Sequence, residues 1–144
     1  MIAALALSVL LAACGSPKPP VGKWEGALDT PDTMVAVRME MGSDGQVRVS
    51  APDLTGIVEG DEALRHGMRE RLSEELAAGW DDVAPRPFDF DGKTFRKPAG
   101  VAPQMVWDKA TNQMTLELYI GANPALPVVL RPVPEFHDDP FGAG

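Results

Sequence analysis

Cysteine is almost absent from this chain of 144 residues, in which Cys14 is the single example. One cysteine cannot form an intramolecular disulfide, so the fold has to be held together by a hydrophobic core. A chain of this length can bury such a core without covalent cross-links. The sequence therefore predicts one ordinary globular domain.

Basic side chains are also scarce. The chain has 13 lysines and arginines against 21 aspartates and glutamates, which gives a net charge of −8. A surface of this sign repels nucleic acid and anionic lipid. We therefore expect neither nucleic acid nor anionic lipid to be a direct partner of the domain.

The residue types that catalysis uses are few and scattered. The two histidines are His66 and His137, and no serine lies in the Gly-x-Ser-x-Gly turn of a hydrolase. The paired acids Asp81-Asp82 and Asp89 with Asp91 lie in turn-like segments, and no glycine-rich loop of the phosphate-binding kind is present. We therefore expect a non-enzymatic protein without a cofactor, with a hydrolase-related enzyme as the third alternative.

Two histidine-containing clusters could in principle bind a metal ion. His66 lies four residues from Glu62 and from Glu70, but a third strong ligand is missing, and such pairs are common on solvated helix faces. The run His137-Asp138-Asp139 offers further ligands, but it lies in a segment expected to be a flexible tail, and metal sites need an ordered cage. We expect no metal site.

The chain begins with "MIAALALSVLLAAC", which carries no charged side chain. The apolar run 2–13 is shorter than the roughly 20 residues that span a bilayer, and it has the length of the apolar region of a signal peptide. The run Leu11-Ala12-Ala13-Cys14 resembles a bacterial lipobox, an aliphatic residue followed by two small residues and the cysteine that is acylated. The alternative is a conventional signal peptide with an incidental cysteine.

The lipobox resemblance implies a division of the chain. Residues 1–13 would be a lipoprotein signal peptide, Cys14 would carry diacylglycerol and an acyl chain such as palmitate, and residues 14–21 would be a proline-rich tether. Gly15 stands where aspartate signals inner-membrane retention in a similar enterobacterial pattern. The resemblance thus implies an outer-membrane protein that faces the periplasm, in contact with the membrane through Cys14 and with an envelope protein as a further expected partner.

Alternating apolar and polar residues predict β-structure through most of the remaining chain. In "MVAVRMEM" the residues Val35, Val37, Met39 and Met41 share one face, which predicts a half-buried strand, and "QVRVS" returns as its hairpin partner. Asp91-Gly92 predicts a second hairpin, and "QMVWDKATNQMTLELYI" predicts a third. The last strand is "LPVVLRPV", whose prolines Pro127 and Pro132 restrict it to an edge or to strand ends.

One segment has helical periodicity. The stripe Leu64, Met68, Leu72 and Leu76 recurs at every fourth position between 60 and 79. Asp61 is suited to the N-cap and Gly79 to the C-terminal stop. The sequence thus predicts one amphipathic helix inserted among strands.

These elements together predict a mainly β (α+β) domain. Seven or eight strands that neighbour one another in sequence favour an antiparallel meander, curled into a small barrel or sandwich. The domain is expected at 22–132, with the helical insertion at about 59–86 and a flexible tail at 133–144.

The opening of the domain has a familiar pattern. Residues 22–28, "GKWEGAL", fit a Gly-x-Trp-x-Gly-x-Leu motif, followed by "SAPDLTGI" and, near the end, "LPVVLR". Over about residues 21–132 the chain resembles the small all-β module found before the catalytic domain of some secreted bacterial α/β-hydrolases, and also found alone. Lipocalin-like barrels share the Gly-x-Trp opening. The helical insertion departs from the module, and no hydrolase domain follows, so no enzymatic activity is implied.

Four apolar side chains are candidate contacts to a ligand or partner: Trp24, Met39, Met41 and Trp107. Methionine adapts to varied shapes and could line a ligand site, although filling gaps in a core is the simpler interpretation. We therefore predict a binding or assembly module held at the membrane. The alternative is a lipocalin-like carrier of a small apolar ligand.

Overall fold

The computed structural model describes residues 17–56, 61–100, 102–120 and 124–142. The predicted signal peptide and Cys14 lie outside the described residues. No helix in the described ranges combines the length and the hydropathy needed to cross a membrane.

The described chain is mainly β, as predicted. It has one α-helix, α2 (Glu62–Gly79), followed directly by a 3-10 turn, η1 (Trp80–Asp82). The strands are β1 (Gly22–Asp29), β2 (Thr33–Met41), β3 (Gln46–Ser50), β4 (Asp53–Thr55), β5 (Arg86–Pro87), β6 (Asp89–Phe90), β7 (Thr94–Arg96), β8 (Pro103–Asp108), β9 (Gln113–Leu118) and β10 (Leu126–Val133). They exceed the seven or eight expected because β4, β5 and β6 are only two or three residues long, too short for alternation to reveal.

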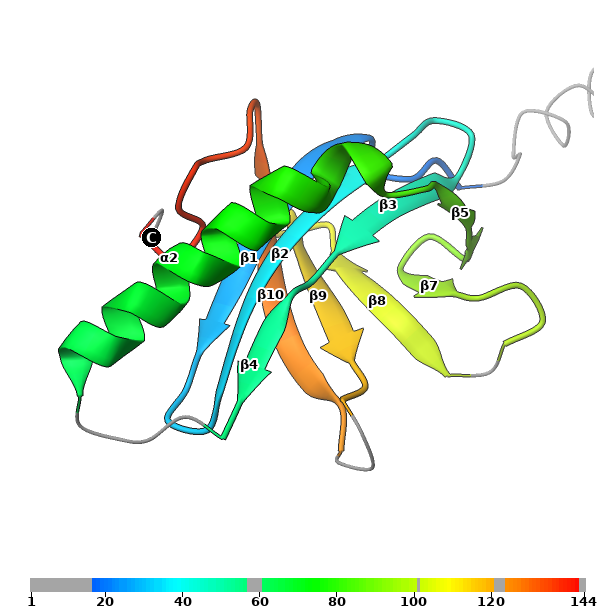
Figure 1. Ribbon diagram of the computed structural model, residues 1–144. Coiled ribbons are helices and arrows are strands. Elements are labelled where there is room, and N and C mark those ends of the chain that lie inside the picture. The colour runs from blue at the N-terminus through cyan, green and yellow to red at the C-terminus, as the bar shows by residue number, and fades with distance from the viewer. Residues whose placement is uncertain (1–16, 57–60, 101, 121–123, 143–144) are drawn as a thin grey trace, which may run out of the picture.

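The strands form one antiparallel sheet in the order β5-β3-β2-β1-β10-β9-β8-β7-β6, with β4 beside β3 on β2. The two edge strands of this sheet, β5 and β6, are separated in sequence by Phe88 alone. The sheet therefore curls until its edges meet at a covalent connection, which gives the barrel-like shape in Figure 1. Phe88 packs inward against the core.

Strand β10 joins the two halves of the sheet. Residues 126–130 pair with β9, whereas residues 131–133 pair with β1. Pro127 and Pro132 each lie one residue from an end of β10, where the strand has a paired neighbour on one side only. A missing backbone N–H is tolerated there, as the sequence predicted.

The close crossing of β1 and β10 depends on Gly26. A Cβ atom built at Gly26 would lie 2.3 Å from the carbonyl oxygen of Val129. Only a residue without a side chain fits there, because the two backbones approach each other so closely.

The barrel interior is filled by large apolar side chains. Its buried members are Trp24, Val35, Val37, Met39, Met41, Val47, Phe95, Met105, Met114, Leu116, Val128 and Leu130. The inward positions on β2 and β3 are the ones that the alternation predicted. The core therefore forms from one face of each strand.

The outer face of β2 is buried as well, so the prediction of a half-buried strand is wrong. Helix α2 lies across this face (Figure 1), and Met34 and Ala36 pack against Leu72 and Leu76. The sequence pattern could not show this burial, because the helix that covers β2 follows it by more than twenty residues. Asp61 caps the helix by accepting a hydrogen bond from the Leu64 N–H at 3.1 Å.

Arg48 attaches the end of α2 to β3. Its guanidinium donates hydrogen bonds to the carbonyl oxygens of Trp80 at 2.6 Å and Val83 at 2.9 Å. It also lies 4.3 Å from the centre of the Trp80 ring and pairs with Glu40 at 3.2 Å. These contacts hold the segment that leads into β5.

Residues 134–142, within the segment expected to be a flexible tail, lie over the outer face of β1 and β2 beside α2 (Figure 1). Pro140 is buried and Phe141 packs against the cluster beneath the helix. The ring of Phe136 meets that of Trp80 edge-on at 5.0 Å. In the structure, this segment and α2 together cover the outer face of the sheet.

Candidate functional site

The barrel has a hollow of about 580 Å³ on the side where β3 and β5 face β8 and β9. Its floor includes Val47, Met105 and Leu116, which belong to the buried core. The hollow therefore reaches the barrel interior. We name it the barrel hollow, and its lining is Val47, Val49, Asp82, Val83, Ala84, Arg86, Phe88, Lys97, Gln104, Met105, Leu116, Glu117, Leu118 and Tyr119.

The barrel hollow has apolar walls and a mixed rim. Val49 on one side and Leu118 on the other are half-buried and pack against the core. The rim carries two cations, Arg86 and Lys97, and two acids, Asp82 and Glu117, so it has no net charge. A concave apolar surface with a few polar groups at its edge is the usual construction of a small-molecule site, and such sites commonly measure about 300–1,000 Å³.

The gap exists because the two edges of the sheet meet over a short distance only. Strand β5 pairs with Gln46 and Val47 of β3, and β6 pairs with Phe95 and Arg96 of β7. Beyond these pairs the remainder of β3 has no neighbouring strand on that side among the described residues. The sequence did not predict the hollow, because its walls come from opposite ends of the strand order.

Three of the four predicted contact residues are core residues. Trp24, Met39 and Met41 are at most 2% exposed. The indole N–H of Trp24 donates to the Pro20 carbonyl oxygen at 3.2 Å. Their packing matches the simpler interpretation that they fill the interior.

Trp107 is half-buried at the other end of the barrel from the rim of the hollow. Its ring lies 6.2 Å from that of Phe90, and its indole N–H donates to the Asn112 side chain at 3.1 Å. It lines a separate surface hollow of about 500 Å³ with Lys93 and Lys109. Trp107 packs against the same core cluster as the other three candidates, but unlike them it is partly exposed.

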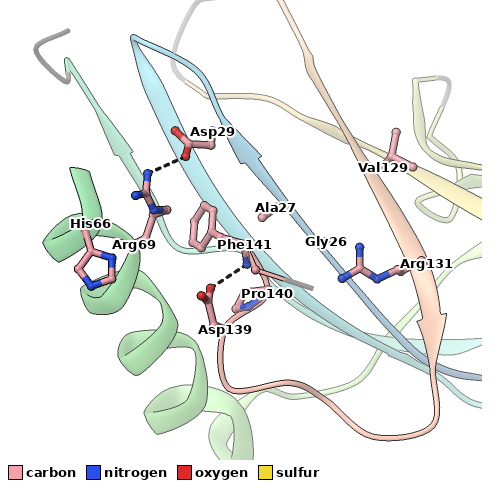
Figure 2. Close-up of a pocket in the computed structure, with 11 residues that line it drawn as sticks. Gly26, Ala27, Asp29, His66, Arg69, Val129, Arg131, Asp139, Pro140 and Phe141 are labelled. Carbon is pink, nitrogen blue, oxygen red and sulfur yellow. Dashed lines mark hydrogen bonds and ion pairs between the residues drawn. The ribbon is translucent and has the colours of Figure 1, made fainter. Parts of the chain in front are cut away.

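A second hollow of about 570 Å³ lies outside the barrel, between α2, the outer face of β1 and the C-terminal segment (Figure 2). Arg69 reaches from α2 to Asp29, and Asp139 accepts the backbone N–H of Phe141 at 2.9 Å (Figure 2). Hydrogen bonds with Glu62 and then with Asp29 raise the pKa of Arg69 above its ordinary value. Arg69 and Asp29 thus pair with each other. None of the residues that line this outer hollow belongs to the barrel core, so it is a weaker candidate than the barrel hollow.

A row of charged side chains crosses three strands beneath the C-terminal segment. Glu25 is only 1% exposed and lies opposite Arg38 of β2 and Arg131 of β10 in the register. Its Oε1 accepts the backbone N–H of His137 at 3.1 Å and lies 2.5 Å from Nδ1 of the same residue. Arg38 in turn donates to the His137 carbonyl oxygen at 3.3 Å. The row fastens the segment to the sheet.

The histidine clusters considered as metal sites do not assemble one. His66 pairs with Glu70 on the exposed face of α2 at 3.1 Å, while Glu62 turns to Arg69. Within the described residues, no three histidine, cysteine, aspartate or glutamate side chains are grouped to hold a metal ion. His137 is engaged with Glu25.

No family model, curated protein or solved structure matches this chain. The resemblance to the Gly-x-Trp module and to lipocalin-like barrels therefore stays a prediction from sequence motifs. The barrel hollow and the lipobox pattern are the two features of the chain that bear on its function.

Proposed function

We propose that this protein is a lipid-anchored lipoprotein of a bacterial envelope, and that its barrel hollow binds a small, largely apolar molecule with a polar end. The observation that carries the binding role is the hollow itself, whose floor is made of core side chains and whose size suits such a ligand. No chemical step is part of this role.

Binding in the hollow is better supported than docking through a flat apolar surface. The large apolar residues most exposed among the described ones are Val21, Leu64, Tyr119 and Val129. Leu64 lies on α2 and Val129 on β10, while Val21 precedes β1 and Tyr119 follows β9. Four residues dispersed in this way do not indicate a patch of the few hundred Å² that mark a protein interface. Tyr119 is the one of the four that lines the barrel hollow.

The anchoring role rests on the lipobox pattern. Each buried acyl methylene contributes about 0.8 kcal/mol, so two or three chains on Cys14 hold a protein durably at a membrane. We propose the outer membrane, with the domain in the periplasm, because Gly15 replaces the aspartate that favours inner-membrane retention in the similar pattern.

Ligand binding is tested with a neutral apolar fluorophore, N-phenyl-1-naphthylamine, titrated into the purified domain. We expect saturable binding to one site. The variants Val49→Trp and Leu118→Trp narrow the hollow from opposite walls and are expected to weaken binding at least several-fold. Leu64→Trp on the outside of α2 is the matched control and should bind normally.

Each variant is first checked for a cooperative unfolding transition, so that weaker binding in a folded variant reports on the hollow. The absence of saturable binding to the unchanged protein, or equal binding by the narrowed and control variants, would overturn the ligand role.

Anchoring is tested separately by mass spectrometry of the N-terminal peptide and by membrane fractionation. We expect processing at Cys14 and an added acyl mass, both lost in Cys14→Ser. If the serine variant is cleaved normally and stays with the membrane, the lipoprotein assignment fails.

A further inference from the structure

The described chain begins against one end of the barrel. Pro17 packs beside Gly92 in the β6–β7 turn, since a Cβ built on Gly92 would lie 3.5 Å from Pro17 Cγ. Pro20 accepts the hydrogen bond from Trp24 at 3.2 Å. Residues 17–20, predicted to be part of an extended tether, are thus held on the domain.

This attachment limits how far the domain can stand from Cys14. Only two residues lie between Cys14 and Pro17. An extended chain covers at most about 3.6 Å per residue, so these three steps keep their Cα atoms within about 11 Å of each other. A lipid on Cys14 would therefore bring this end of the barrel to the membrane surface.

Three turns meet at the same end: the β2–β3 turn (42–45), the β6–β7 turn (91–93) and the β8–β9 loop (109–112). The antiparallel register places the start of β1 beside the end of β2, and so beside the β2–β3 turn. The backbone N–H of Trp107 donates to the Lys93 carbonyl oxygen at 2.7 Å, which joins the end of β8 to the β6–β7 turn. We call the surface made by residues 17–21 and these three turns the anchor end. The β1–β2 turn lies at the opposite end (Figure 1).

The acids of the anchor end are turned toward their own backbone. Asp44 accepts the Gln46 N–H at 3.0 Å, Asp91 accepts the Lys93 N–H at 2.9 Å, and Asp108 accepts the Ala110 N–H at 3.0 Å. Each carboxylate keeps its charge, but backbone donors of its own turn occupy one of its oxygens.

The lysines of the anchor end, unlike its acids, are not held by the turns. Lys18, Lys93 and Lys109 are exposed, and none of their ammonium groups pairs with an acid among the described residues. Asp44 and Asp91 lie within the anchor end and Asp108 directly precedes the β8–β9 loop, so the three lysines face three aspartates, while the whole chain carries −8. The acids at the opposite end include Asp29, Asp32, Asp53, Asp61 and Glu62. Arg65 and Arg69 pair with two of these acids, so the group as a whole remains negatively charged.

From this arrangement we infer that the anchor end lies flat on the phospholipid surface, with the three lysines at the headgroup phosphates and Trp107 near the interface. The inference rests on the proposed lipid anchor. Repulsion between the −8 chain and anionic lipid is smallest in this orientation, because the neutral end faces the membrane and the acidic end faces away. Tryptophan and lysine are both suited to the interface, since each joins an apolar body to a polar tip.

The orientation also places the barrel hollow. Lys97, Gln104 and Tyr119 belong to the end of the hollow that is remote from the three turns. The hollow would therefore open to the side and away from the bilayer, so that a ligand enters from the aqueous compartment.

The test uses the full lipidated protein in vesicles of phosphatidylethanolamine and phosphatidylglycerol. Cys14 is the only cysteine and its thiol is blocked by the lipid, so one introduced cysteine can be labelled with a fluorophore. The labelled positions are Ser43→Cys and Thr111→Cys at the anchor end, with Thr55→Cys on β4 as the matched exposed position at the far end. We expect a water-soluble quencher to reach the first two several-fold less in vesicles than in detergent, with Thr55→Cys unchanged.

A charge variant separates orientation from anchoring. The triple variant Lys18→Glu, Lys93→Glu and Lys109→Glu should remain acylated and vesicle-bound but lose the protection of Thr111→Cys, whereas Arg71→Glu on the exposed face of α2 should keep it. Acylated protein with equal quenching at both ends would overturn the orientation alone. Absence of an acyl mass on Cys14 would overturn the lipid anchor, and the orientation with it.

Discussion

His137 reaches back across the sheet to Glu25, 112 residues earlier, and places its Nδ1 2.5 Å from the Glu25 Oε1. The carboxylate is 1% exposed, whereas the imidazole is half-exposed. The contact therefore joins a buried charge in β1 to the segment that covers it. Glu25 also lies opposite Arg38 and Arg131 on the neighbouring strands, so its negative charge is the one between two cations.

Replacing Glu25 should destabilise the fold and release the C-terminal segment. Glu25→Ala leaves the backbone N–H of His137 without its acceptor and removes the negative charge opposite Arg38, so we expect a loss of about 2–3 kcal/mol in the free energy of unfolding in urea. Hydrogen exchange over residues 134–142 should rise in the same variant. Glu135→Ala, which removes a surface ion pair with Lys23, is the matched control and should cost at most about 1 kcal/mol. Equal stability of the two variants would contradict a structural role for Glu25.

Adding one methyl group at Gly26 should destabilise the protein, whereas adding one at Gly67 should stabilise it. Gly26→Ala would push a Cβ against the Val129 carbonyl oxygen, and β1 and β10 would have to separate. Gly67 lies in α2 with nothing within 4 Å of a built Cβ, so Gly67→Ala should stabilise the protein by about 1 kcal/mol through helix propensity. Thermal unfolding of the two variants measures both effects. A Gly26→Ala variant as stable as the unchanged protein would show that the strands can move apart freely.

Asp91 should give the β6–β7 hairpin a stability that disappears in acid. Hydrogen bonds from the backbone of Thr94 and of Lys93, followed by one from Arg96, lower the pKa of Asp91 below its ordinary value of 3.8. Because the folded pKa is the lower one, the contribution is complete above the unfolded value and is lost as the pH falls through the folded value.

Asp91→Asn removes this contribution, so the variant should be less stable than the unchanged protein at pH 6, and the difference should shrink as the pH falls below about 4. Urea midpoints at several pH values provide the measurement. A difference that stays constant with pH would show that the carboxylate charge is not involved.

Arg48 should control the closure of the barrel at β5. Arg48→Ala removes the hydrogen bonds to Trp80 and Val83, the ion pair with Glu40 and the contact with the Trp80 ring. Several half-buried interactions are lost together, so we expect a loss of about 2–3 kcal/mol and faster hydrogen exchange over residues 83–87. Arg71→Ala, on the exposed face of α2, is the matched control and should have little effect. Unchanged exchange at 83–87 would contradict this role for Arg48.

The hairpins and the helix follow from short-range patterns in the sequence. Alternation identified the inward face of β2 and β3, Asp91-Gly92 located the β6–β7 turn, and Asp61 located the start of α2. These features depend on neighbours within a few residues, and the same physical preferences operate in the unfolded chain. The lipobox resemblance at Cys14 is local in the same sense.

Other features depend on segments that are distant in sequence. The second buried face of β2, the fastening of His137 to Glu25 and the barrel hollow between Val49 and Leu118 arise where elements from different parts of the chain meet. The sequence by itself determined the longer strands, their turns and the one helix, because local backbone preference and alternation decide them. Only the tertiary structure decided which strands were buried on both faces, which charges were buried and where the barrel stayed open. Burial depends on which distant segments of the chain pack against a surface.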